Sequence, residues 1–139
     1  MPRTLLAGLS RTADPRVTLR RFLALDAAVT GLNGAAYLAA PGPIGRLFGI
    51  DGSLLAALGA LLVAVAAGIG LLASRREPPV AAVKLVVDVN AAWALLSLAA
   101  VVLWLEPTAA GAVWTPAQAL TVACFAGLQW AALRATATG

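Results

Sequence analysis

Four polar side chains share one face of the first long apolar segment. Asp26, Thr30, Asn33 and Tyr37 follow one another at intervals of four, three and four residues. On a helix they fall within an arc about 60° wide and rise by about 16 Å. A carboxyl, a hydroxyl, an amide and a phenol in such a stripe are typical of a site that binds a polar group or moves a proton within a membrane.

A later apolar segment carries polar residues on two opposite faces. Lys84 and Asp88 lie one helical turn apart on the first face. Asn90 and Trp93 lie on a second face, about 180° around the helix. Because such groups are costly inside a membrane, we expect them to meet partners from other helices.

Depth along the helices predicts which groups meet. Segments that run in the same direction bring residues equally far from their starts to the same level. The inner layer is expected to hold Asp26, Lys84 and Gln129, and the midplane layer Thr30, Asn33 and Asp88, with Tyr37 toward the outside.

Two carboxyls and one amine in these layers could perform acid–base chemistry. Unlike Arg, a buried Lys can lose its proton, and an unpaired carboxylate at membrane depth takes up a proton or a partner. If the protein is an enzyme, Asp26 and Asp88 are its expected general acid and base. The structural alternative is one salt bridge between Asp26 and Lys84, with the amides as hydrogen-bonded contacts between helices. The predicted ligand-binding residues are Thr30, Asn33, Tyr37, Lys84, Asn90, Trp93 and Gln129.

The composition excludes most classes of soluble protein. Of the 139 residues, 61% are hydrophobic and 12% charged, against about 45–50% and about 25% in soluble domains. A single Cys excludes a disulfide scaffold, and the lack of His argues against a Cys/His metal site. We therefore expect an integral membrane protein with the lipid bilayer as its surroundings and with no metal or cofactor.

Four segments are long enough to cross a hydrocarbon core of about 30 Å. They span about 22–40, 53–73, 80–105 and 117–133. Asp14 before Pro15 indicates a helix start in the interface, and Thr115 with Gln118 predicts a capping box at the last helix. The predicted fold is an all-α four-helix bundle with antiparallel neighbours over residues 15–135, with a polar or interfacial leader at 1–14, a tail at 136–139 and a loop from Pro41 to Asp51.

The cations are distributed unevenly over the connections. Nine of the ten lie before the first segment, between the second and third, early in the third or after the fourth, and only Arg46 lies in a connection of the opposite side. The positive-inside rule then predicts a multi-pass protein of the bacterial inner membrane with both termini cytoplasmic. The same distribution argues against nucleic acid as a partner, since no basic stripe alternates with aromatic residues.

Three phrases of the sequence carry a resemblance. Residues 20–26 (RRFLALD), 30–38 (TGLNGAAYL) and 88–93 (DVNAAW) resemble small, uncharacterised four-helix membrane proteins of high-GC bacteria, a resemblance that implies no activity. With an acidic residue early in the first of four helices, the chain also resembles small multidrug transporters. Those carry Glu at the position of Asp26, in a bundle richer in aromatic residues.

Three functions agree with these features. The first is a bundle whose polar interior binds a small or lipophilic ligand or a partner helix. The second is a proton-coupled transporter of small molecules that acts as a homodimer. The third is a membrane-embedded enzyme, such as an isomerase, cyclase or epoxide hydrolase, that acts on a lipophilic substrate with Asp26 and Asp88 as acid and base.

Overall fold

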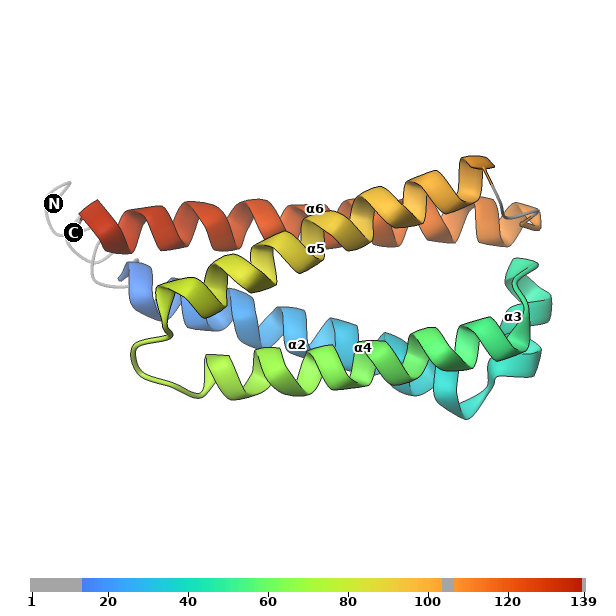
Figure 1. Cartoon of the computed structure of the whole chain (residues 1–139), viewed down its shortest axis with the longest axis horizontal. Coiled ribbons are helices and arrows are strands. Elements are labelled where there is room, and N and C mark those ends of the chain that lie inside the picture. Colours follow the sequence, from blue (N-terminus) through green and yellow to red (C-terminus); the bar gives the residue numbers. More distant parts are fainter. Residues whose placement is uncertain (1–13, 104–106, 139) are drawn as a thin grey trace, which may run out of the picture.

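The structure, a computed structural model, describes residues 14–103 and 107–138, and within them all regular secondary structure is helical. The helices are α2 (Pro15–Ala39), α3 (Pro41–Phe48), α4 (Gly52–Ala73), α5 (Val80–Leu103) and α6 (Ala109–Thr138) (Figure 1). All except α3 are long and apolar enough to cross a membrane, which suggests a multi-pass membrane protein. The predicted all-helical class and the four long apolar helices are confirmed. Residues 1–13 of the predicted leader and the end of the predicted third span lie outside the described residues.

Helix α2 begins earlier than the predicted span, which started at residue 22. The carboxylate of Asp14 accepts a hydrogen bond from the backbone N–H of Arg16 at 3.0 Å, and Pro15 occupies the first turn. The guanidinium of Arg16 pairs with Glu77 at 3.1 Å, and Arg20 donates to the carbonyl of Ala73 at 3.0 Å. These contacts make the arginine-rich turn helical and join the start of α2 to the end of α4.

A short helix occupies most of the stretch predicted as a loop. Helix α3 starts with Pro41 in its first turn and ends at Gly49, whose positive φ of 73° closes the last turn. Phe48 stacks on Trp114 with ring centroids 5.7 Å apart. The backbone N–H of Thr108 donates to the carbonyl of Phe48 at 3.1 Å. Helix α3 is therefore fastened to the start of α6.

The predicted start of the last helix is wrong. Helix α6 begins at Ala109, and Pro116 lies inside it rather than at its first turn. The cap is Thr108, whose hydroxyl oxygen accepts from the N–H of Gly111 at 3.2 Å. Proline weakens a helix interior because it lacks an N–H, but here the contacts of Thr108 and Trp114 with α3 hold the preceding turns. Helix α6 also includes residues 136–138, which the sequence assigned to a tail.

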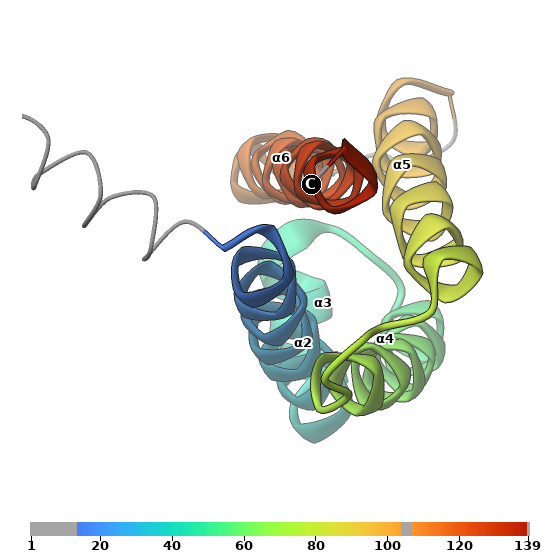
Figure 2. The ribbon, with the colours of Figure 1, turned by 90° about the vertical axis from the view of Figure 1, so that its left-hand side faces the viewer.

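The long helices pack as two close pairs. Helix α2 lies along α4, α5 lies along α6, and α2 also contacts α6, whereas α4 and α5 make few contacts (Figure 2). In the first pair, a Cβ at Gly34 would lie 2.9 Å from the carbonyl oxygen of Gly59, so this approach needs glycine. Apolar clusters form at both ends of the molecule. One cluster, around Leu23, Ile69 and Val83, lies near the end of α4 and the start of α5. The other, around Tyr37, Leu55 and Leu62, lies near α3.

Candidate functional site

A buried carboxylate joins three long helices between the two apolar clusters. Asp26 of α2 has an exposed fraction of 0%. Its Oδ2 accepts from the side-chain amides of Asn90 in α5 and Gln129 in α6, both at 2.7 Å, and its Oδ1 accepts from the hydroxyl of Thr30 at 3.0 Å. The amide nitrogen of Asn90 also donates to Oε1 of Gln129 at 3.1 Å. We call these four residues the Asp26 cluster.

The carboxylate determines how both amides are oriented. A carboxylate only accepts, so the NH₂ groups of Asn90 and Gln129 must face Asp26. Both hydrogens of the Asn90 amide are then used, and its carbonyl oxygen Oδ1 points out of the cluster and has no hydrogen-bond partner among the described residues. Every side-chain nitrogen or oxygen that is fully buried among the described residues has a partner, so this unpartnered oxygen must have some accessible surface. Because Asn90 as a whole is only 4% exposed, we infer that its Oδ1 reaches a cavity.

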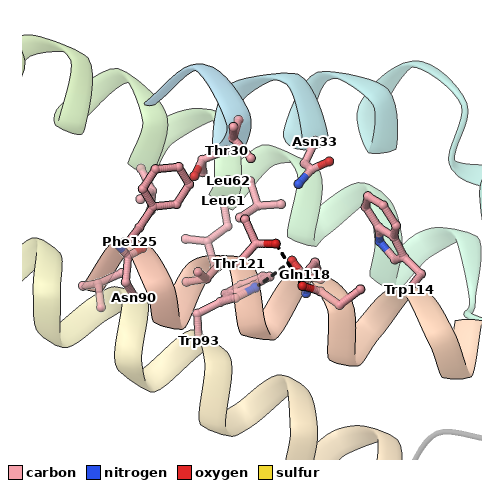
Figure 3. Close-up of a pocket in the computed structure, with 15 residues that line it drawn as sticks. Thr30, Asn33, Leu61, Leu62, Asn90, Trp93, Trp114, Gln118, Thr121 and Phe125 are labelled. Atoms are coloured by element: carbon pink, nitrogen blue, oxygen red, sulfur yellow. Dashed lines mark hydrogen bonds between the residues drawn. The ribbon is translucent and has the colours of Figure 1, made fainter. Parts of the chain in front are cut away.

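That cavity lies in the centre of the molecule and has a volume of about 360 Å³. All four long helices contribute to its wall (Figure 3). Most of the wall is apolar, from residues such as Leu61, Leu62 and Phe125. The amide of Asn33, which has no hydrogen-bond partner among the described residues, also lines it. The polar residues on the wall are Thr30, Asn33, Asn90, Trp93, Gln118 and Thr121.

A second cavity of about 380 Å³ continues toward α3. Trp93 and Gln118 line both cavities, and the indole N–H of Trp93 donates to Oε1 of Gln118 at 3.4 Å. Tyr37 lines the second cavity, and its hydroxyl accepts from the indole N–H of Trp114, which lines both, at 2.8 Å. The two cavities therefore form one column, divided by the Trp93–Gln118 contact.

The column opens sideways between α4 and α5. Leu61 of α4 and Val89 of α5 line the first cavity, yet they are 50% and 38% exposed. Helices α4 and α5 also make few contacts with each other. A molecule could enter at this seam without passing either end of the helices.

Most of the predicted site residues come together, but two do not. Thr30, Asn33, Asn90 and Trp93 line the first cavity and Tyr37 the second. Asp26 and Gln129 lie behind them in the Asp26 cluster. The predicted stripe on α2 faces protein and cavity: Asp26, Thr30 and Tyr37 are buried, and Asn33 is half-buried.

Lys84 and Asp88 lie on the exposed side of α5. Asp26 forms no ion pair with Lys84, so the expected inner layer is corrected: Asn90 takes the position that Lys84 was predicted to fill. The reason is helical geometry, because Asp88 and Asn90 are two residues and thus about 200° apart. Only one of these faces can turn inward, and α5 buries Val83, Asn90 and Ala94.

The sequence interpretation missed the role of two residues on α6. Gln118 was assigned to a cap and Trp114 had no place in the site, yet both line the two cavities. Trp114, Gln118, Thr121 and Phe125 follow the spacing of one helical face. Gln118, Thr121 and Phe125 already share a face within the predicted last segment, and only Trp114 requires a helix that begins before Pro116.

The two carboxyl groups of the predicted site do not meet. The Asp26 carboxylate lies behind Asn90 and Thr30, and Asp88 is on another face of the molecule. Within residues 14–103 and 107–138, no three His, Cys, Asp or Glu side chains come together as metal ligands would. Comparisons with protein-family models, with curated proteins and with solved structures gave no match to this chain.

Proposed function

We propose that this chain is a four-helix bundle of the bacterial inner membrane, with both termini cytoplasmic, that binds a lipophilic molecule with one neutral polar end. The observation that carries the proposal is the unpartnered carbonyl oxygen of Asn90, which faces an apolar cavity that opens to the side. A free acceptor in such a wall is costly unless a donor from a ligand or from water meets it.

The wall defines the chemistry of the ligand. The volume of about 360 Å³ lies within the usual range of small-molecule sites, about 300–1,000 Å³. A hydroxyl group would exchange hydrogen bonds with the amide of Asn33, while water or a second donor would meet Oδ1 of Asn90, which lies well apart from Asn33 on the same wall (Figure 3). Among the described residues, no Lys or Arg lines this cavity, so an anionic head group would find no counter-charge there. A neutral alcohol or amide with an apolar body fits best.

The side opening supports entry from the bilayer. The gap between α4 and α5 lies along the length of helices that are long and apolar enough to span a membrane. A lipophilic molecule dissolved in the hydrocarbon region would reach the seam at Leu61 and Val89 without crossing water. Asp26 then serves as a positioning residue, because it holds the Asn90 amide in the orientation that exposes its carbonyl oxygen.

Acid–base catalysis and proton-coupled transport have weaker support. Both need a titratable group that meets the substrate or ion. In the part of the chain that the structure describes, no Asp, Glu or Lys lines the cavity, and Asp26 and Asp88 do not share a site.

Binding can be tested with a matched pair of brominated probes, 11-bromoundecan-1-ol and 1-bromoundecane. Bromine quenches indole fluorescence, and Trp93 and Trp114 line the cavity. In a background with Trp104 and Trp130 replaced by Phe, the alcohol should quench saturably, and dodecan-1-ol should displace it. The alkane, which has no polar end, should bind about tenfold more weakly, the worth of one hydrogen bond.

Asn33→Leu gives the sharpest variant. Asn33 has no hydrogen bond to lose among the described residues, so the Asp26 cluster should stay intact while affinity for the alcohol falls about tenfold. Leu32→Ala is the control, because Leu32 is next to Asn33 in the chain but is 72% exposed and points away from the protein. Equal affinity for the alcohol and the alkane, or for Asn33→Leu and the control, would refute the proposed site.

A further inference from the structure

A groove lies at the end of the bundle where α2 and α5 begin and α6 ends, the end that faces the viewer in Figure 2. It has a volume of about 850 Å³, and the connection from α4 to α5 forms part of its wall. We call it the Lys84 groove, and its charged residues are Arg16, Glu77, Lys84 and Arg134. It shares no lining residue with the two cavities of the column.

The charges in the Lys84 groove do not balance. Three cations and one carboxylate line it among the described residues, which leaves two positive charges. Glu77 pairs with Arg16 at 3.1 Å, but the two side chains are 75% and 60% exposed, and an ion pair so exposed is weak. Lys84 forms no ion pair or hydrogen bond with another described residue. The groove is therefore suited to an anion.

The cations favour a phosphate as that anion. The planar fork of an arginine donates two parallel hydrogen bonds to phosphate oxygens, and a lysine adds a compact charge. Arg16, Lys84 and Arg134 come from three different helices, α2, α5 and α6. The guanidinium of Arg134 also lies over the ring of Trp130, with its Cζ 6.0 Å from the ring centroid. This cation–π contact brings a charged group and an apolar surface together in one wall.

The apolar part of the wall indicates that the phosphate belongs to a lipid. Val80 and Trp130 line the groove and are 54% and 43% exposed. Lys84 lies four residues after the start of α5, about 6 Å along the axis, and from that level a long side chain reaches the head groups of a bilayer. Tryptophan is also enriched at this level. A soluble phosphate would leave the apolar wall in water, whereas the first methylenes of a lipid would cover it.

We propose that the Lys84 groove binds the head group of an anionic phospholipid such as phosphatidylglycerol. Lys84 and Arg134 contact the phosphate, and Trp130 contacts the apolar part next to it. Basic pockets between helix ends bind anionic head groups in this way. A zwitterionic lipid carries the same phosphate, but its ammonium brings a further positive charge to a groove that already has an excess of two.

The inference needs the long helices to span a bilayer, which is one part of the proposed function, but it does not need the ligand cavity. The alcohol probes of the cavity carry no charge, and Trp93 and Trp114, which report their binding, do not line the Lys84 groove. Failure at one site therefore leaves the result at the other unaffected.

Native mass spectrometry of the protein released from detergent micelles measures lipid binding directly. Phosphatidylglycerol should bind about tenfold more tightly than phosphatidylcholine with the same acyl chains. Lys84→Gln should lower the affinity for phosphatidylglycerol about fivefold, the worth of one cation near a head group. Glu77→Gln should raise it by a similar factor, because the only carboxylate of the described groove wall is then neutral and Arg16 is released.

Arg21→Gln is the matched control. It removes one positive charge from the same end of the bundle, at an exposed position of α2 that does not line the groove, so affinity should change less than twofold. An equal loss for Arg21→Gln and Lys84→Gln would show diffuse attraction in place of a site and would overturn the proposal. So would equal affinity for the two lipids, or a soluble glycerol phosphate that binds as tightly as phosphatidylglycerol. The opposite signs expected for Lys84→Gln and Glu77→Gln exclude misfolding as a common cause.

Discussion

Replacing Asp26 by Leu should destabilise the protein by an amount that its hydrogen bonds allow us to work out. The change removes the acceptor for Asn90, Gln129 and Thr30. Thr30 can donate instead to a carbonyl of its own helix, so its bond is replaced. Two bonds between helices remain lost. Such bonds in membranes average about 0.6 kcal/mol and reach about 1.7 kcal/mol, which gives a loss of about 1–3 kcal/mol.

Asp26→Asn should cost less than this. The remaining carbonyl oxygen can still accept from Asn90 and Gln129, and the new NH₂ can donate to the hydroxyl oxygen of Thr30. The loss is then limited to the weakening of charge-assisted bonds to neutral ones. Removing Asp26, Asn90 and Gln129 together, all to Leu, should cost less than the sum of the three single changes, because no polar group is left without a partner.

The free energy of unfolding can be measured by titration with sodium dodecyl sulfate in mixed micelles, followed by circular dichroism. Lys84→Met serves as the control for the corrected pairing. Because Asp26 and Lys84 form no ion pair, their changes should add to within about 0.5 kcal/mol, whereas Asp26 and Asn90 should be coupled. If Asp26→Leu were as stable as the wild type, or if Asp26 were coupled to Lys84 and not to Asn90, the reasoning from the Asp26 cluster would be refuted.

Three further predictions concern the packing, the caps and the topology. Gly34→Ala should destabilise the α2–α4 pair by about 1–3 kcal/mol, the usual cost of overpacking, because the new Cβ would lie 2.9 Å from the carbonyl oxygen of Gly59. Gly68→Ala is the control, and it should be neutral or stabilising in the same titration because a Cβ there would have no atom within 4 Å. Thr108→Ala should lower stability by about 1 kcal/mol through loss of the α6 cap, and an unchanged unfolding midpoint would contradict that role. A cysteine at Pro43, in α3, should react with an impermeant maleimide on intact cells. A cysteine at Ser74, just after the end of α4, should react only after permeabilisation, and the reverse pattern would contradict the proposed orientation.

The sequence alone predicted what depends on neighbouring residues. Apolar runs of about 20 residues locate the membrane-spanning helices because crossing the hydrocarbon core requires that length. The cap at Asp14 was readable because its carboxylate bonds a backbone N–H two residues ahead. The stripe of α2 was likewise visible, since intervals of three and four residues align side chains on one helical face whatever that face contacts.

Only the tertiary structure decided which face of α5 turns inward. Its polar residues lie on two opposite faces, and local spacing ranks neither above the other. Packing against α6 selects the face of Asn90, whose short amide reaches both Asp26 and Gln129, and Lys84 and Asp88 are left on the outside. The start of α6 was decided in the same way. Proline normally ends a helical prediction, but contacts of Thr108 and Trp114 with α3, which lies more than 50 residues earlier in the chain, hold the turns of α6 that precede Pro116. Such contacts depend on residues distant in sequence, and no local pattern contains them.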